Sequence, residues 1–245
     1  MQPELQRLID DCYAAFASYP PPRKLHASPL RDSVAILETL TSAPLRELTG
    51  EQIGPYAGWA MTTVGDVADY KHFLPRILEQ AVRASLWTGT DPPIIANRLK
   101  MAQWQDWPDA ERGAIRALFT GAFSQAIEGH PDDGDDAEDW ICGIAILDLG
   151  LSATLNAWLA APSMNAALQL ATFLTRSCMF EADPVERAYW SYVDAPTAHL
   201  VRRWLLSDRI LQRLSSARGW TMPSDQWLID KALATQAARR LERLQ

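Results

Sequence analysis

The stretch of sequence that decides the fold is AEDWICGIAILDLGLSATLNAWLAAPSMNAALQLATFLTRSC, residues 137–178. Apolar residues recur in it at helical spacing in three runs, and short joints that contain Gly or Pro separate these runs. Ser163 precedes the third run, where a hydroxyl can accept the unpaired N–H groups of a helix start. The stretch therefore predicts three consecutive helices, near 137–149, 151–161 and 164–178.

The rest of the chain continues this pattern. Ala and Leu, which both favour helices, supply 36 and 30 of the 245 residues, and no run of five or more residues alternates as a strand would. Short connections make consecutive helices antiparallel neighbours. The sequence therefore predicts an all-α fold of about ten helices in stacked antiparallel pairs, in a single domain over residues 1–245. Further helices are expected to begin at Pro3 and at the capping-box pattern Thr49–Gln52, the second of them running to about Thr62. Others are expected over 66–73, from Pro75 (as a first-turn residue or a kink) to 87, after Asp91 and after Trp107. The last four are expected near 184–192, 196–206, 208–218 and 224–244.

Two segments interrupt the predicted helices, an extended connector near residues 20–30 and an acidic loop at 130–136. A faint repeat is also present, because LNAWL at 155–159 aligns with VRRWL at 201–205, an offset of 46 residues. Such an offset is typical of HEAT-like helix pairs and predicts a short α-solenoid. The alternative is that Trp-Leu pairs recur by chance in a chain with 10 Trp and 30 Leu.

The net charge of −7 argues against binding to nucleic acid or to an anionic membrane. The charge is unevenly distributed, since residues 200–245 carry 9 Lys and Arg against 4 Asp and Glu. This C-terminal basic run predicts a solvated helical face, and the alternative is a surface for an acidic protein partner, ahead of nucleic acid. Its members are Arg202, Arg203, Arg209, Arg213, Arg218, Arg239, Arg240 and Arg243.

Cysteines and apolar runs indicate the compartment. Cys12, Cys142 and Cys178 lie far apart in apolar surroundings, which predicts buried, reduced thiols and no disulfide framework. The longest apolar stretch, Ile141–Leu147, is much shorter than the roughly 20 residues that span a bilayer, and the N-terminus lacks the pattern of a signal peptide. We therefore expect a cytoplasmic protein without a membrane partner.

The strongest polar cluster lies in GDVADYKHFLPR, residues 65–76. In a helix, Asp66, Asp69 and His72 are stacked at spacings of three, and Arg76 follows one turn later. A carboxylate beside an imidazole is the arrangement of a general base or of a ligand site. Asp66, Asp69, Tyr70, His72 and Arg76 are therefore candidate ligand-binding residues.

The same cluster has a structural interpretation, which we prefer. Asp66 would cap a helix, and His72 would pack where two helices meet. Asp69 would then pair with Arg76 or Lys71.

Residues 65–76 also carry a resemblance to known proteins. GDxxDYKHFLPR is similar to a motif in uncharacterised bacterial all-helical proteins of similar length, and the VxxWL pattern at 201–205 resembles another segment of them. The resemblance implies a bacterial, all-helical protein and no particular activity.

Tryptophan is abundant, and its positions suggest two roles. Trp104 and Trp107 lie between predicted helices in a setting of Gln, Asp and Pro, so we expect them to line a groove or ligand site. The indoles that fall on apolar helical stripes are expected in the core, namely Trp140, Trp158, Trp204 and Trp227.

The sequence contains no GxSxG, HExxH, P-loop or dinucleotide-binding motif. The acidic loop also fails as an EF-hand, because Gly129 would occupy its first, carboxylate position. We therefore expect no cofactor and no metal. The preferred hypothesis is a non-catalytic helical scaffold that binds another protein. The alternative is an enzyme or small-ligand binder whose polar site lies around Asp66–Arg76.

Overall fold

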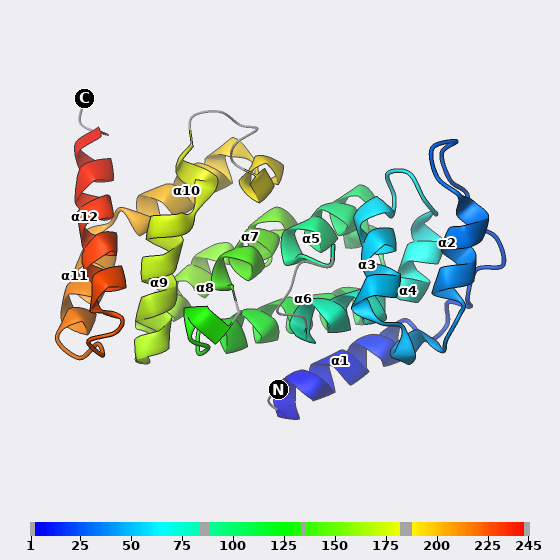
Figure 1. Ribbon diagram of the computed structural model, residues 1–245, viewed down its shortest axis with the longest axis horizontal. Helices are drawn as coiled ribbons and strands as arrows, with labels where there is room; N and C mark the ends of the chain where they lie inside the picture. Colours follow the sequence, from blue (N-terminus) through cyan, green and yellow to red (C-terminus); the bar gives the residue numbers. More distant parts are fainter. Residues whose placement is uncertain (1–2, 84–88, 134–135, 182–187, 243–245) are drawn as a thin grey trace. The chain divides into compact units, whose positions relative to one another are not determined.

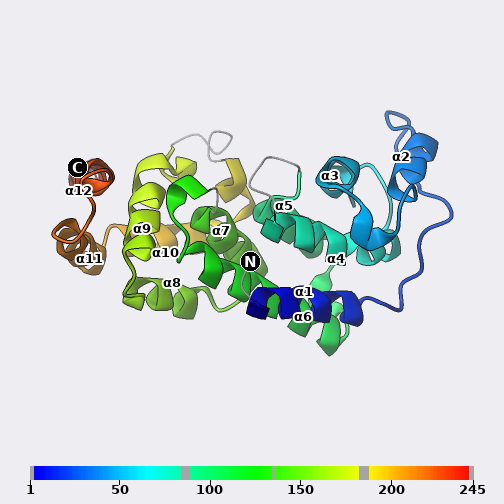
Figure 2. The same cartoon turned by 60° about the horizontal axis from the view of Figure 1, so that its bottom comes forward.

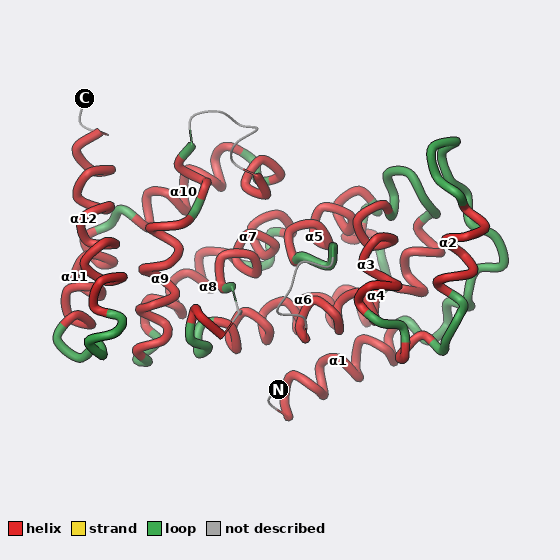
Figure 3. The backbone as a smooth tube through the Cα atoms, viewed as in Figure 1, coloured by secondary structure: helices red, strands yellow, loops and turns green. Residues whose placement is uncertain are grey.

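The computed structural model describes residues 3–83, 89–133, 136–181 and 188–242 (Figure 1). Over these ranges the chain forms twelve α-helices and five short 3-10 helices, and the only β-pairing within them consists of isolated bridges (Figure 3). The predicted all-α fold of stacked helices is therefore confirmed. The chain divides into two compact units, Met1–Ala122 and Phe123–Gln245. The single domain over 1–245 and the HEAT-like repeat stay predictions.

The first unit is built around one long helix, α4, against which α1, α3 and α5 pack. The side chains of Tyr70, Phe73, Leu74 and Ile77 on α4 are fully buried and form the centre of the core. The helices of this unit are α1 (Pro3–Ala15), α2 (Ser33–Leu40), α3 (Gly50–Trp59), α4 (Val67–Arg83), α5 (Pro92–Met101) and α6 (Asp109–Ala126), which runs across the boundary, with the 3-10 helices η1 (Leu45–Glu47) and η2 (Trp104–Asp106).

Pro75 lies inside a helix, where the sequence predicted either a fresh helix start or a kink. α4 continues through it from Val67 to Arg83, so the predicted fresh start at Pro75 is wrong. The buried apolar residues before and after Pro75 lie on one side of the helix, and their burial outweighs the backbone hydrogen bond that proline cannot make. The end of the helix predicted over 75–87 lies outside the described residues.

Capping residues set the position of α2 and α3. The Asp32 carboxylate accepts the N–H groups of Val34 and Ala35 at the start of α2. The predicted capping box of α3 is confirmed: the Thr49 hydroxyl accepts the N–H of Gln52, and the Gln52 side chain accepts the N–H of Thr49 at 2.7 Å. α3 ends at Trp59, three residues before the predicted end.

Residues 20–30, where the sequence predicts an extended connector, form no helix and end in a turn. Backbone hydrogen bonds tie it to the loop before α4, from Ser28 N–H to the Thr63 carbonyl (2.9 Å) and from Gly65 N–H to the His26 carbonyl (2.7 Å). These bonds hold the connector alongside the end of α3.

In the second unit, α9 packs against both α11 and α12, and these two helices pack against each other (Figures 1 and 2). The predicted cap at Ser163 is confirmed, because its hydroxyl accepts the N–H of Ala166. Residues 134–135 of the acidic loop, and 184–187 of the helix predicted near 184–192, lie outside the described residues. The elements of this unit are η3 (Pro131–Asp133), α7 (Ala137–Leu147), α8 (Leu151–Ala160), α9 (Met164–Arg176), η4 (Cys178–Phe180), η5 (Ala188–Tyr192), α10 (Ala195–Leu205), α11 (Asp208–Arg218) and α12 (Gln226–Glu242).

Three of the four tryptophans expected in the core pack there at least in part. Trp158 is fully buried, stacks on Phe173 and contacts Trp204, while Trp140 is also buried. Trp227 is different, because 55% of it is exposed, and the prediction that it packs in the core is wrong. It is the second residue of α12, and the buried stripe of that helix begins just after it.

Candidate functional site

The two carboxylates of the predicted polar cluster cap the start of α4. Asp66 Oδ1 accepts the N–H groups of Ala68 (2.8 Å) and Asp69 (3.0 Å), and Asp69 Oδ2 accepts the N–H of Asp66 (3.1 Å). Burial raises the pKa of Asp69 above its ordinary value. The predicted cap at Asp66 is confirmed, and both carboxylates are held by backbone donors.

His72 and Arg76 face other segments of the first unit. His72 Nδ1 donates to the carbonyl of Tyr19 (2.9 Å), and its ring lies edge-on to Phe73. Arg76 donates to the carbonyl of Leu48 and to the carboxylate of Glu79, each at 2.7 Å. Tyr19 lies in the loop after α1, so the packing of His72 where two helices meet stays a prediction. Arg76 does not pair with Asp69. These two side chains are seven residues apart on one helix, beyond the reach of neighbours three or four apart.

Tyr70 is buried in the core, and its hydroxyl has no hydrogen-bond partner among the described residues. The structure thus brings Asp66 and Asp69 together at a helix start and directs Tyr70, His72 and Arg76 to separate contacts. Ligand binding by these five residues stays a prediction, and their contacts give it no support.

Trp104 and Trp107 are both buried, so they do not form the wall of an open groove. Trp107 Nε1 donates to the carbonyl of Ala102 (3.1 Å), and its ring lies edge-on to Phe16. The polar residues around the two indoles in the sequence misled the prediction, because the aromatic rings themselves turn into the core. A ligand site at Trp104 and Trp107 stays a prediction without support from their positions.

A buried ion pair that the sequence did not reveal lies next to Trp107. The Lys71 ammonium is 2.7 Å from the Glu111 carboxylate and 4.1 Å above the Trp107 ring. Tyr19 completes the group, because its hydroxyl accepts from Lys71 (2.8 Å) and donates to Glu111 (2.7 Å). The predicted pairing of Lys71 with Asp69 is therefore wrong. Side chains two apart on a helix point to different faces, and Lys71 points toward α6.

A second buried carboxylate, Glu79, joins α4 to α1. It accepts from the Tyr13 hydroxyl (2.7 Å), from Arg76 (2.7 Å) and from Arg83 (2.9 Å). Burial pushes the pKa of Glu79 up, but the hydrogen bonds from Tyr13 and Arg76 outweigh it and hold the pKa below its ordinary value. Glu79 therefore stays charged and serves as a link between helices.

The C-terminal basic run is largely used in contacts within the second unit. Arg213 donates to the carbonyls of Ala161 and Ser163, and Arg202 donates to the carbonyl of Met179. Other members pair with carboxylates, as Arg218 does with Asp230 and Arg240 with Asp208, whereas Arg243 lies outside the described residues.

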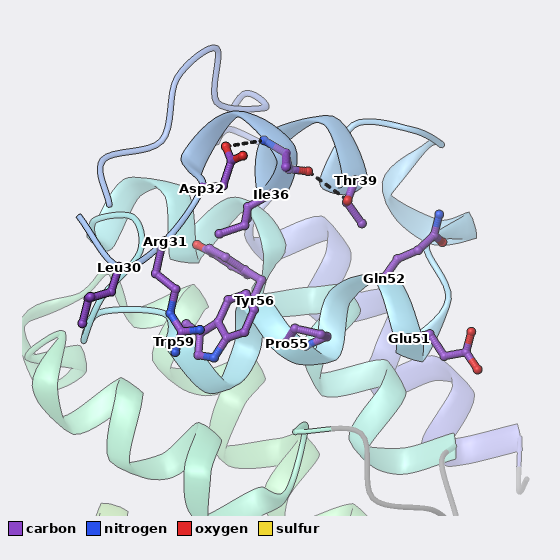
Figure 4. A pocket seen from close by; sticks show the side chains of 11 residues that line it. Leu30, Arg31, Asp32, Ile36, Thr39, Glu51, Gln52, Pro55, Tyr56 and Trp59 are labelled. Atoms are coloured by element: carbon purple, nitrogen blue, oxygen red, sulfur yellow. Dashed lines mark hydrogen bonds between the residues drawn. The ribbon is translucent and has the colours of Figure 1, made fainter. Parts of the chain in front are cut away.

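An open pocket of about 350 Å³ lies between the connector, α2 and α3 (Figure 4). We call it the α2–α3 pocket. Its walls are mostly apolar, and the residues that matter below are Leu30, Arg31, Ala35, Ile36, Tyr56 and Trp59.

The helix on one side of this pocket is unusually exposed for its composition. α2 has the sequence SVAILETL, yet Leu40 is its only buried residue. Val34 is 65% exposed, and Leu30, just before the helix, is 90% exposed. Exposed apolar surface that is continuous with a pocket often marks an interaction site.

Arg31 is a cationic residue that lines the α2–α3 pocket. Its guanidinium lies 4.0 Å from the centre of the Trp59 ring, and Figure 4 shows the two side by side. Its Nε is buried and has no hydrogen-bond partner among the described residues. The Tyr56 hydroxyl is likewise buried without a partner within the described ranges, and burial, with the nearby Asp69 carboxylate, raises the pKa of Tyr56.

Comparison with known proteins adds no family. No protein-family model matches the chain, and no curated protein or solved structure matches it. Among the described residues, no group of three or more His, Cys, Asp or Glu side chains is placed to hold a metal ion. None of the described helices is long and apolar enough to cross a membrane. The resemblance of residues 65–76 to uncharacterised bacterial proteins stays a prediction.

The α2–α3 pocket was missed because helical spacing does not show which side of α2 stays uncovered. One signal could have found it. At roughly 100° per residue, Val34 falls on a different side of the helix from Ile36 and Leu40. Apolar residues on two sides of so short a helix leave one side uncovered unless a partner packs on it.

Proposed function

We propose that the protein is a non-catalytic helical scaffold that binds a segment of another protein at the α2–α3 pocket. The observation that carries the proposal is the open apolar pocket beside α2, with Leu30 and Val34 exposed next to it. Its volume of about 350 Å³ is at the lower end of ligand pockets, roughly 300–1,000 Å³, and suits a few side chains of a docking segment better than a large cofactor.

The contacts of the titratable groups support a non-catalytic role. A general acid or base must be within hydrogen-bond reach of its substrate. Asp66 and Asp69 are held by backbone N–H groups, and His72 donates to a carbonyl. Lys71 and Glu111 are paired with each other. The alternative of an enzyme or small-ligand binder around Asp66–Arg76 would require these contacts to open.

We propose further that the protein meets this partner in the cytoplasm. Cys12 and Cys142 are buried, and burial raises the pKa of both thiols, so neither is a reactive thiolate. Thiols of this kind are typical of proteins in a reducing compartment.

Selection from a displayed library of random peptides tests the proposal. We expect selected peptides to bind the wild-type protein in titration calorimetry and to lose binding with Ala35→Glu. Ala35 is exposed on α2 and lines the pocket, so a glutamate there blocks the pocket and leaves the core intact.

Ala68→Glu is the matched control, because Ala68 is an exposed helical residue of the same unit outside the pocket lining. It should bind the peptides as the wild type does. A library without binders, or binders that Ala35→Glu leaves unaffected, would contradict the proposal.

A further inference from the structure

We infer that the α2–α3 pocket recognises a carboxylate next to an apolar side chain of the bound segment, with the Arg31 guanidinium as the group that binds the anion. The inference rests on the proposed function and adds the chemistry of the partner. It predicts an acidic, apolar docking segment in a partner protein.

The first argument is the position of Arg31. The indole of Trp59 holds the Arg31 guanidinium by contact with its flat face. The N–H groups lie along the edge of the guanidinium, so they stay available to an acceptor. Its Nε is buried, and leaving a buried donor without an acceptor costs free energy. A planar carboxylate is the acceptor that matches the fork of N–H donors.

The second argument is that several cationic side chains of the first unit have carboxylate partners, while Arg98 donates to the carbonyl of Gly58. Arg46 pairs with Asp10, Arg76 with Glu79, and Lys71 with Glu111. Within the described ranges, the buried Nε of Arg31 has no hydrogen-bond partner, and the guanidinium lies over the Trp59 ring.

Two acidic residues also line the pocket, and neither neutralises Arg31. The Asp32 carboxylate accepts two backbone N–H groups at the start of α2, which hold it at the helix end. Glu51 lies across the pocket from Arg31 in Figure 4. The pocket is thus polarised, with the cation at the Trp59 end and an apolar wall of Ala35, Ile36 and Pro55 beside it.

This polarity fits a segment in which an Asp or Glu lies close to a bulky apolar residue. The apolar side chain would enter between α2 and α3 and contact Ile36, while the carboxylate would meet Arg31 above Trp59. The open side at Leu30, which is 90% exposed, leaves a path for the rest of the partner chain. Because the pocket is open at Leu30, it would cover less of the surface of a small molecule than a closed pocket would.

Paired peptides test the inference. One peptide carries the acidic residue enriched by the library, and its twin carries the matching amide, Gln or Asn. The wild-type protein should bind the acidic peptide at least about tenfold more tightly, because a hydrogen bond to a charged group contributes about that factor. Arg31→Gln should bind the two peptides equally, with the affinity that the wild type shows for the amide peptide.

Arg31→Lys is the second variant, and we expect it to recover part of the preference, since it keeps the charge and loses the fork geometry. Raised salt should weaken binding of the acidic peptide and leave the amide peptide unaffected. Circular dichroism of each variant shows that it is folded before its affinity is compared.

The outcomes separate the inference from the proposed function. Peptides that bind, depend on Ala35 and show no preference for the acid would overturn the inference while the proposed function stands. The absence of any binding peptide would overturn the proposed function. Benzoate that binds as tightly as the acidic peptide, with the same dependence on Arg31, would assign the pocket to a small carboxylate and overturn the peptide partner.

Discussion

Lys71 and Glu111 are two charged residues that folding has removed from water, with 9% and 6% of their side chains exposed. Removing one partner of such a pair leaves the other charge buried and uncompensated. We expect Glu111→Leu to lower the free energy of unfolding by about 3–5 kcal/mol, measured by urea denaturation.

The double variant Lys71→Met with Glu111→Leu is the control for this prediction. It should recover most of the lost stability, because both buried charges leave together and apolar groups replace them. If Glu111→Leu alone unfolds at the same urea concentration as the wild type, the pair does not hold α4 to α6, and Lys71 becomes a candidate functional group.

Glu138 is the residue whose titration should be visible in the stability of the protein. Burial raises its pKa from the ordinary 4.5 to about 7, although Ser177 and Trp190 donate hydrogen bonds to its carboxylate. Because the pKa is higher in the folded state, the stability that the protonated Glu138 contributes is fully present below about pH 4.5 and is lost as the pH rises toward 7. The loss amounts to about 3 kcal/mol.

Glu138→Gln removes this titration and keeps an oxygen that can accept both hydrogen bonds. Urea denaturation from pH 4.5 to 7.5 gives the unfolding free energy of the wild type and of this variant. The wild type should lose stability relative to the variant as the pH rises. A constant difference across this range would show that Glu138 titrates normally in the folded protein.

At the scale of elements, helix starts were predictable because their signals are local. Thr49, Asp66 and Ser163 each accept the N–H of a residue two or three positions ahead, and this spacing is visible in the sequence. The contacts of Arg76 with the Leu48 carbonyl and of Lys71 with Glu111 were not predictable, since these acceptors lie 28 and 40 residues away. Only the packing of α4 against its neighbours brings those groups together.

The α2–α3 pocket shows the same limit for a whole element. The spacing of Val34, Ile36 and Leu40 is helical, but which side of α2 is covered depends on where the connector at 20–30 and α3 lie. The bonds that fix the connector are made by backbone groups of Ser28 and Gly65, and backbone pairing leaves no pattern in the side chains. A pocket formed by such contacts follows from the tertiary structure alone.

At the scale of the whole molecule, the all-α class followed from composition and periodicity, which act on every segment at once. The division into two units did not. Both units contain Ala- and Leu-rich helices with short connections, so the local pattern is the same on either side of Ala122 and Phe123. Their separation depends on which helices share a core.

Two phenylalanines, one in each core, test whether the units open independently. Phe173 is fully buried between the rings of Trp158 and Trp190, and Phe73 is fully buried on α4. Replacing either by alanine should cost about 3–5 kcal/mol. In hydrogen exchange, Phe173→Ala should expose the amides of α7–α12 and leave those of α1–α5 protected, while Phe73→Ala should do the reverse. If both variants lose protection throughout, the chain opens as one cooperative domain.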